Sequence, residues 1–147
     1  MKARTAGLIV IICGVVFIVA GVATYVMVST TLSSENITVS EDASMFAGQH
    51  VDQPWEAFAE ASVIDKHANE ISGGKSYAEL PRTDPNRTTV MNASFLQASL
   101  FTSVVAFGVA AMAAVVGAVF VVIGLALRAL PTVAAGATAP ATSRSAA

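Results

Sequence analysis

The sequence predicts an all-α membrane protein, in which two transmembrane helices form a helical hairpin joined by a small, mostly helical extracytoplasmic segment. Two long runs, residues 6–28 and 98–127, contain no charged residue and no histidine. Hydrophobic residues make up 54% of the chain and charged residues only 12%, where about 25% charged is usual in soluble domains. All 10 acidic residues lie between the two runs. This composition excludes an ordinary soluble enzyme and a disordered chain.

Each apolar run is long enough to cross a bilayer, because about 20 residues of helix cover about 30 Å of hydrocarbon. A chain in lipid has to satisfy its backbone hydrogen bonds internally, so we expect both runs to be helical. The start of the chain also resembles a signal peptide, with a cleavage site at residues 21–23. The apolar core of a cleaved signal is about 7–15 residues long. Run 6–28 is longer, so we expect it to be retained as an anchor.

The distribution of charge predicts the orientation. The N-terminus (1–5) and the C-terminal tail (128–147) contain basic residues and no acidic residue. The loop, residues 29–97, contains the 10 acidic residues and the four remaining basic ones, Lys66, Lys75, Arg82 and Arg87. By the positive-inside rule, both termini are cytoplasmic and the loop is extracytoplasmic, in a multi-pass protein of the plasma membrane. The tail is rich in Ala, Thr and Ser, and we expect it to be disordered.

Small residues recur at helical spacing in both apolar runs. Glycines follow one another every seven residues in the first run, and a similar face can be traced in the second. The residues are Gly7, Gly14 and Gly21 in the first run, and Ala110, Ala114, Gly117 and Gly124 in the second. Such residues allow helix backbones to approach closely in lipid. We expect these faces either to pack the two spans together or to dock on a partner protein.

An amphipathic helix is expected over about residues 54–72 of the loop. Pro54 is typical of a helix start and Gly73 of a helix end. Between them, Trp55, Phe58 and Val63 recur at helical spacing. A segment of this size is hard to stabilise with its own core, so this stripe is expected to pack on the spans, on the membrane surface or on another protein. Trp55, Phe58 and Val63 are therefore candidate partner contacts, and Trp55 is alternatively a membrane-interface anchor or a core residue.

Two further signals concern the end of the loop. Ser76 and Glu79 have the spacing of a capping box, which predicts a short turn. Asp84 followed by Pro85 is typical of a helix start. We therefore expect the second long helix to begin near Pro85 and to run unbroken into the membrane.

The sequence predicts no catalytic, cofactor or metal site. Asp52, Glu56 and Glu60 share a helix face, which we interpret as a solvated acidic face rather than a cation site. His50 and His67 lack the compact spacing of a metal site. No nucleophile motif accompanies the serines, and no basic cluster suits a nucleic acid. The protein is therefore expected not to be an enzyme.

Three segments resemble a family of small actinobacterial membrane proteins. They are residues 35–43 (ENITVSEDA), 73–80 (GGKSYAEL) and 98–108 (ASLFTSVVAFG), within a similarity that covers about residues 5–127. The family is commonly labelled "aromatic ring-opening dioxygenase". The resemblance implies two spans with an outer loop and transfers no functional residue. Non-haem iron is held by two histidines and a carboxylate that leave positions open for substrate, a site that this short loop is not expected to form.

The leading functional hypothesis is a non-catalytic accessory or assembly subunit of a larger membrane complex, respiratory or cell-envelope. Its expected partners are the lipid bilayer and proteins of that complex, and the sequence leaves self-association open. Small-residue faces, an amphipathic helix without a partner and the absence of a catalytic constellation support this hypothesis. The alternative is an extracytoplasmic sensor or ligand-binding module anchored by the two spans.

Overall fold

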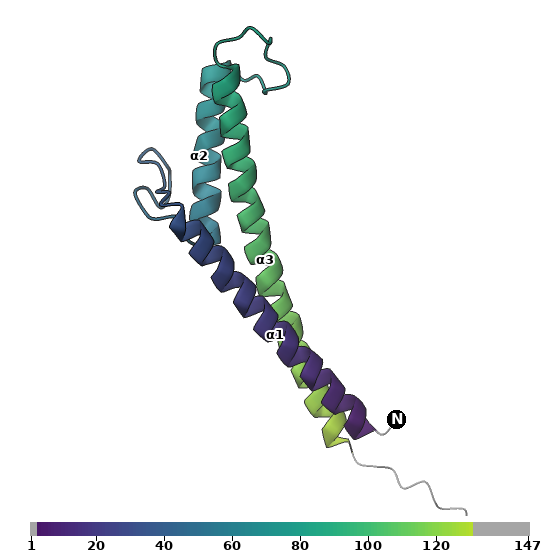
Figure 1. Cartoon of the computed structure of the whole chain (residues 1–147). Helices are drawn as coiled ribbons and strands as arrows, with labels where there is room; N and C mark the ends of the chain where they lie inside the picture. Colours follow the sequence, from purple (N-terminus) through teal and green to yellow (C-terminus); the bar gives the residue numbers. More distant parts are fainter. Residues whose placement is uncertain (1–2, 131–147) are drawn as a thin grey trace, which may run out of the picture.

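The computed structural model describes residues 3–130 and contains three helices (Figure 1). α1 spans Ala3–Ser34, α2 spans Pro54–Ser72 and α3 spans Arg87–Ala129. Within these residues there is no strand, and the one β feature is an isolated bridge between Thr38 and His50. The prediction of an all-helical fold is confirmed. The predicted tail lies outside the described residues except at its start, where α3 continues to Ala129.

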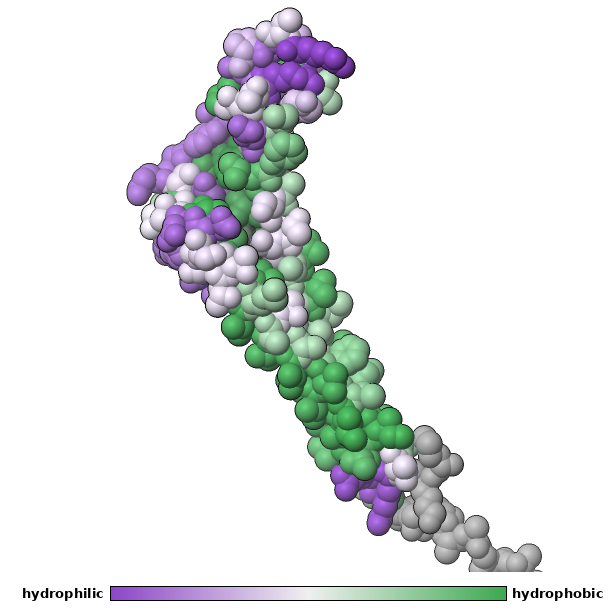
Figure 2. Space-filling model, in the orientation of Figure 1, coloured by the Kyte–Doolittle hydropathy of each residue, from purple (hydrophilic) through white to green (hydrophobic). Residues whose placement is uncertain are grey.

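α1 and α3 lie against each other near the N-terminus of α1 and diverge toward its C-terminus (Figure 1). α2 packs along the part of α3 that continues beyond this point. At 1.5 Å per residue, α1 with 32 residues is about 48 Å long and α3 with 43 residues is about 65 Å long. Both are long and apolar enough to cross a membrane. Hydrophobic residues cover most of the face of this helix pair that Figure 2 shows, and hydrophilic residues lie at its lower end.

The contact between α1 and α3 is a seam of small residues. A Cβ atom added to Gly14 would lie 2.6 Å from the carbonyl oxygen of Gly117, and one added to Gly117 would lie 2.5 Å from that of Gly14. Gly7 and Gly124 face each other in the same way, both at 2.6 Å. These pairs bring backbone against backbone, which only residues without a side chain allow.

The seam ends where α1 and α3 begin to diverge. A Cβ added to Gly21 would lie 2.5 Å from the carbonyl oxygen of Ala110 and 2.9 Å from the backbone nitrogen of Ala114. One turn after Gly21 on α1, Tyr25 packs on Phe107 of α3 with 4.7 Å between the ring centroids. The larger rings hold the two backbones farther apart than the glycines do.

α2 has the predicted bounds. Pro54 is its first residue, and the backbone N–H of Gln53 donates to Glu56 Oε2 at 3.0 Å. Gly73 follows the helix with φ 66°, in the left-handed region that favours glycine. The N–H of Gly74 then donates to the carbonyl of Asn69 at 2.8 Å.

α3 begins two residues later than expected, at Arg87. Asp84 accepts a hydrogen bond from the N–H of Asn86 at 2.8 Å, so it caps a turn that precedes the helix. One of the two bonds of the expected capping box is present, because the N–H of Ser76 donates to Glu79 Oε2 at 2.8 Å. The Ser76 hydroxyl also donates to this oxygen at 2.8 Å, and the N–H of Glu79 donates to the carbonyl of Ser76 instead of the hydroxyl. From Arg87 onward α3 is unbroken to Ala129.

Candidate functional site

The connecting segment, residues 35–53, folds against α2 and is held there by two glutamates. Glu60 accepts hydrogen bonds from the N–H of Ser40 at 2.7 Å and from its hydroxyl at 3.1 Å. Glu56 accepts from the N–H of Asp52 at 3.1 Å and from the indole N–H of Trp55 at 3.2 Å. Both glutamates are buried, at 7% and 8% exposure. The interpretation of this face as solvated is therefore wrong, because the connecting segment covers it and supplies N–H donors to the carboxylates.

A small apolar core lies beneath this segment, where α1, α2 and α3 meet. Val39 and Val51 of the connecting segment are buried, at 1% and 0% exposure. The core also includes Leu32, Ala57, Ala61, Leu100 and Phe107. The hydroxyl of Tyr25 in α1 donates to Gln53 Oε1 at 2.7 Å, which joins α1 to the start of α2. The outer end of the helix pair and α2 therefore form one packed unit.

A third carboxylate, Asp42, fastens the outer part of the connecting segment to α2. Its Oδ2 lies 2.9 Å from His67 Nε2 and 3.1 Å from Lys66 Nζ. The hydrogen bond from His67, followed by that from Lys66, holds the pKa of Asp42 below its ordinary value of 3.8. The ionised form of Asp42 is therefore the form that the folded chain favours.

This geometry predicts an acid-sensitive contact. Above about pH 4 Asp42 is ionised in the folded and in the unfolded chain, so its stabilising contribution is complete there. The contribution is lost as the pH falls through the lowered pKa of the folded state. We expect amide protection in residues 41–48, measured by hydrogen exchange and corrected for intrinsic rates, to fall in this range. In Asp42→Asn the ionised contact is absent at every pH, so the amide protection of residues 41–48 should be low already at neutral pH and should change little on acidification. If acid lowers the protection of the variant as much as that of the unsubstituted chain, the prediction is wrong.

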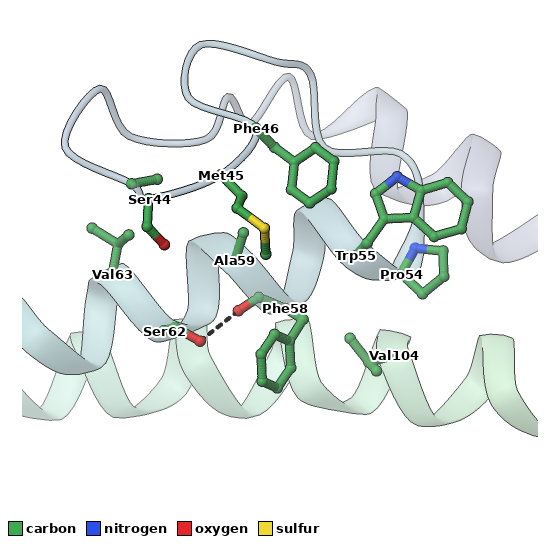
Figure 3. Close-up of a pocket in the computed structure, with 11 residues that line it drawn as sticks. Ser44, Met45, Phe46, Pro54, Trp55, Phe58, Ala59, Ser62, Val63 and Val104 are labelled. Atoms are coloured by element: carbon green, nitrogen blue, oxygen red, sulfur yellow. Dashed lines mark hydrogen bonds between the residues drawn. The ribbon is translucent and has the colours of Figure 1, made fainter.

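An apolar groove lies between the connecting segment and α2 (Figure 3). Residues 43–46, the first three turns of α2 and Val104 of α3 line this groove, which has a volume of about 450 Å³. The exposed fractions of Met45, Trp55 and Phe58 are 62%, 51% and 54%. The ring of Phe58 packs edge-on against Phe101 of α3, with 5.8 Å between centroids.

The structure thus separates the residues of the predicted apolar stripe. Trp55 and Phe58 are exposed beside the groove, whereas Val63 is buried at 7% exposure and forms part of the groove wall. Val63 therefore has little surface to offer a partner. The small residues Ala57 and Ala61 face the core instead of the large ones, because the connecting segment lies close to this side of α2.

Apolar residues are also exposed on the outer part of α3, away from the groove. Phe95 is 66% exposed and Leu96 is 52% exposed. At 1.5 Å per residue they lie about 18 Å and 17 Å beyond Phe107, where the rings of α1 and α3 meet. Leu96 also borders a second apolar groove beside the end of α1, with Thr31 and Ile37. Exposed apolar residues of this size mark a surface that a partner can cover.

The two histidines serve separate parts of the fold. His50 Nε2 lies 3.2 Å from Ser33 Oγ at the end of α1, and His67 contacts Asp42. Across residues 3–130, no three His, Cys, Asp or Glu side chains are grouped so that they could hold a metal ion. No pattern in the sequence predicts the contacts of Glu60 with Ser40 and of Asp42 with His67, because the partners are 20 and 25 residues apart.

No known protein family, curated protein or solved structure matches the chain.

Proposed function

We propose that this chain is a two-span membrane protein that acts as a non-catalytic accessory or assembly subunit of a larger membrane complex. α1 and the part of α3 that packs against it cross the plasma membrane, and both termini are cytoplasmic. α2 and the outer part of α3 form an extracytoplasmic stalk. The observation that supports a partner most directly is the exposed pair Phe95 and Leu96 on this stalk.

The surface of the helix pair supports membrane insertion. Large aliphatic side chains are exposed along both helices, among them Val16 at 58%, Val19 at 61% and Val122 at 65%. In water such a continuous apolar surface would be covered. In lipid it is the surface expected of a helix pair whose own contact consists of small residues.

The position of the charges supports the proposed orientation. Arg128 lies beside Gly7, because a Cβ added to Gly7 would be 2.8 Å from Arg128 Cγ. The basic ends of α1 and α3 are therefore at the same end of the pair. The acidic residues belong to the connecting segment, α2 and the loop that follows α2. Basic residues at one end and acidic residues at the other agree with a cytoplasmic position for both termini.

The stalk surface at Phe95 and Leu96 is the proposed contact with a protein partner. At 1.5 Å per residue, Leu96 and Phe95 lie about 48 Å and 50 Å along α3 from Arg128, which is beyond a hydrocarbon core that is about 30 Å thick. Large apolar residues near the centre of an interface contribute much of its binding energy. A protein of the same complex that lies alongside the stalk would cover both side chains.

Purification of the tagged protein from native membranes in mild detergent tests the proposal, with mass spectrometry and native sizing as readouts. We expect other subunits to co-purify in fixed stoichiometry. The double variant Phe95→Ser with Leu96→Ser should lower their recovery by about tenfold, which corresponds to about 1.4 kcal/mol of binding energy. The control is Val109→Ser, because Val109 is also 52% exposed but lies within the helix pair. A clean monomer or homo-oligomer would contradict the proposal.

The second candidate function is an extracytoplasmic sensor or ligand-binding module. The groove volume of about 450 Å³ falls within the range of small-molecule sites, about 300–1,000 Å³. Thermal-shift and calorimetric titrations of the full chain in detergent separate the two functions. A saturable response to a small apolar ligand would favour the sensor, and an accessory subunit should show none.

A further inference from the structure

The groove beside α2 lies at the level where a bilayer would end, if the helix pair crosses the membrane as proposed above. Arg4 and Tyr25 are 21 residues apart on α1, which is about 31 Å of helix. Arg128 and Val104 are 24 residues apart on α3, which is about 36 Å. The hydrocarbon core is about 30 Å thick, and about 40–45 Å with both headgroup regions. A groove bounded by Val104 is therefore at the outer boundary between hydrocarbon and headgroups.

The exposed side chains of α2 change character along its axis at this level. Its first two turns expose Trp55 and Phe58. Farther along, the exposed residues are polar or charged, among them Asp65, Lys66 and Glu70, with Ile71 as the apolar exception at the end of the helix. A helix that leaves the membrane boundary and enters water is expected to show this order.

The groove itself offers hydrocarbon and few polar groups. Residues 43–46 and the α2 residues that line it include no charged side chain. The hydroxyl of Ser62 donates to the carbonyl of Phe58 at 2.8 Å, and the indole N–H of Trp55 donates to Glu56. These two donors are therefore already used within the protein. Figure 3 shows Met45 and Phe46 opposite α2 across the groove.

The backbone conformation at Phe46 places an aromatic side chain in the wall of the groove. Phe46 has φ 62°, a left-handed conformation that is unfavourable for a bulky residue. The strained turn keeps an aromatic side chain in the groove wall, where a glycine would fit the backbone at lower cost. The turn thus directs the Phe46 side chain to the groove wall and to the core beneath it.

We propose that acyl chains of outer-leaflet lipids occupy this groove, so that Trp55, Phe58 and Met45 lie at the membrane boundary. The apolar surface of the helix pair continues into the groove through Val105 and Phe101, which are exposed at 64% and 36%. Lipid that surrounds the helix pair therefore reaches the groove without crossing a polar surface. This inference rests on the proposed membrane insertion, and the experiment below tests the two separately.

The chain contains one tryptophan and one cysteine, which serve as two independent reporters. Cys13 is exposed on α1, about 14 Å from Arg4 along the helix. A fluorescent maleimide on Cys13 reports on insertion, and the intrinsic emission of Trp55 in unlabelled protein reports on the groove. Both are measured in phosphatidylcholine vesicles that contain brominated acyl chains, which quench by contact. Iodide is the quencher from the water side.

We expect brominated lipid to lower the Trp55 emission by about twofold or more, with bromine near the headgroup more effective than bromine near the chain end, as suits an interfacial indole. Iodide should have little effect. The control is Ile71→Trp in a Trp55→Phe background, because Ile71 is 45% exposed on the same helix and about 24 Å farther along it. That tryptophan should respond to iodide and not to brominated lipid.

Other outcomes overturn the inference. If brominated lipid quenches the label on Cys13 but not Trp55, the helix pair is inserted and the groove is outside the lipid. If neither lipid nor iodide quenches Trp55 while the Cys13 label is quenched, protein covers the groove instead. If the Cys13 label itself is not quenched by brominated lipid, membrane insertion fails, and with it the proposed function.

Discussion

Valine at Gly14 is expected to force α1 away from α3 and to lower the free energy of unfolding by about 3 kcal/mol, the upper end of the cost of overpacking. A Cβ at this position would lie 2.6 Å from the carbonyl oxygen of Gly117 and 2.9 Å from the backbone nitrogen of Val121. Both atoms belong to a helix backbone, which cannot rotate aside as a side chain can. The helices have to separate, and the neighbouring contact of Gly7 with Gly124 is lost with them. Unfolding in mixed detergent micelles measures the change.

Gly108 provides the matched control for this prediction. It lies in α3 within the helix pair, but a Cβ added to it would meet no atom within 4 Å. Gly108→Val makes the same chemical change without the close contact, so we expect an effect within about 0.5 kcal/mol. Gly14→Ala should fall between the two variants. Equal destabilisation by Gly14→Val and Gly108→Val would show that the loss of glycine, and not the seam, is responsible.

The periodicity of the sequence predicts the small-residue face of α1 but not the helix that packs against it. The seven-residue spacing of Gly7, Gly14 and Gly21 predicts a face of small residues, but such a face fits another span or a partner equally well. The structure places Gly14 against Gly117 and so supplies the pairing. No property of a single helix contains this information, because the pairing depends on how the chain returns after the loop.

The face of α2 that packs inward could not be predicted in the same way. The spacing of Trp55, Phe58 and Val63 predicts an apolar stripe that packs on the spans, on the membrane surface or on another protein. Within the chain, the structure buries Val63 and leaves the two aromatic residues exposed. Ala57 is buried instead, next to glutamates whose carboxylates accept hydrogen bonds from a segment that precedes the helix. A hydrophobicity pattern assigns carboxylates to water, so it misses a helix face on which they are satisfied by backbone N–H groups.

Glu60→Ala is expected to release the connecting segment from α2 at a cost of about 2 kcal/mol, within the range for a lost partner of a buried polar group. The substitution removes the acceptor of both bonds from Ser40 and leaves its N–H unpaired in a partly buried place. Hydrogen exchange at Ser40 and its neighbours measures the release, which corresponds to a roughly thirtyfold loss of protection. Glu60→Gln keeps one carbonyl oxygen as acceptor and should lose less. Glu70→Ala removes an exposed carboxylate from the same helix and should leave exchange at Ser40 unchanged. If both alanine variants open the segment equally, helix stability and not the anchor at Glu60 determines its position.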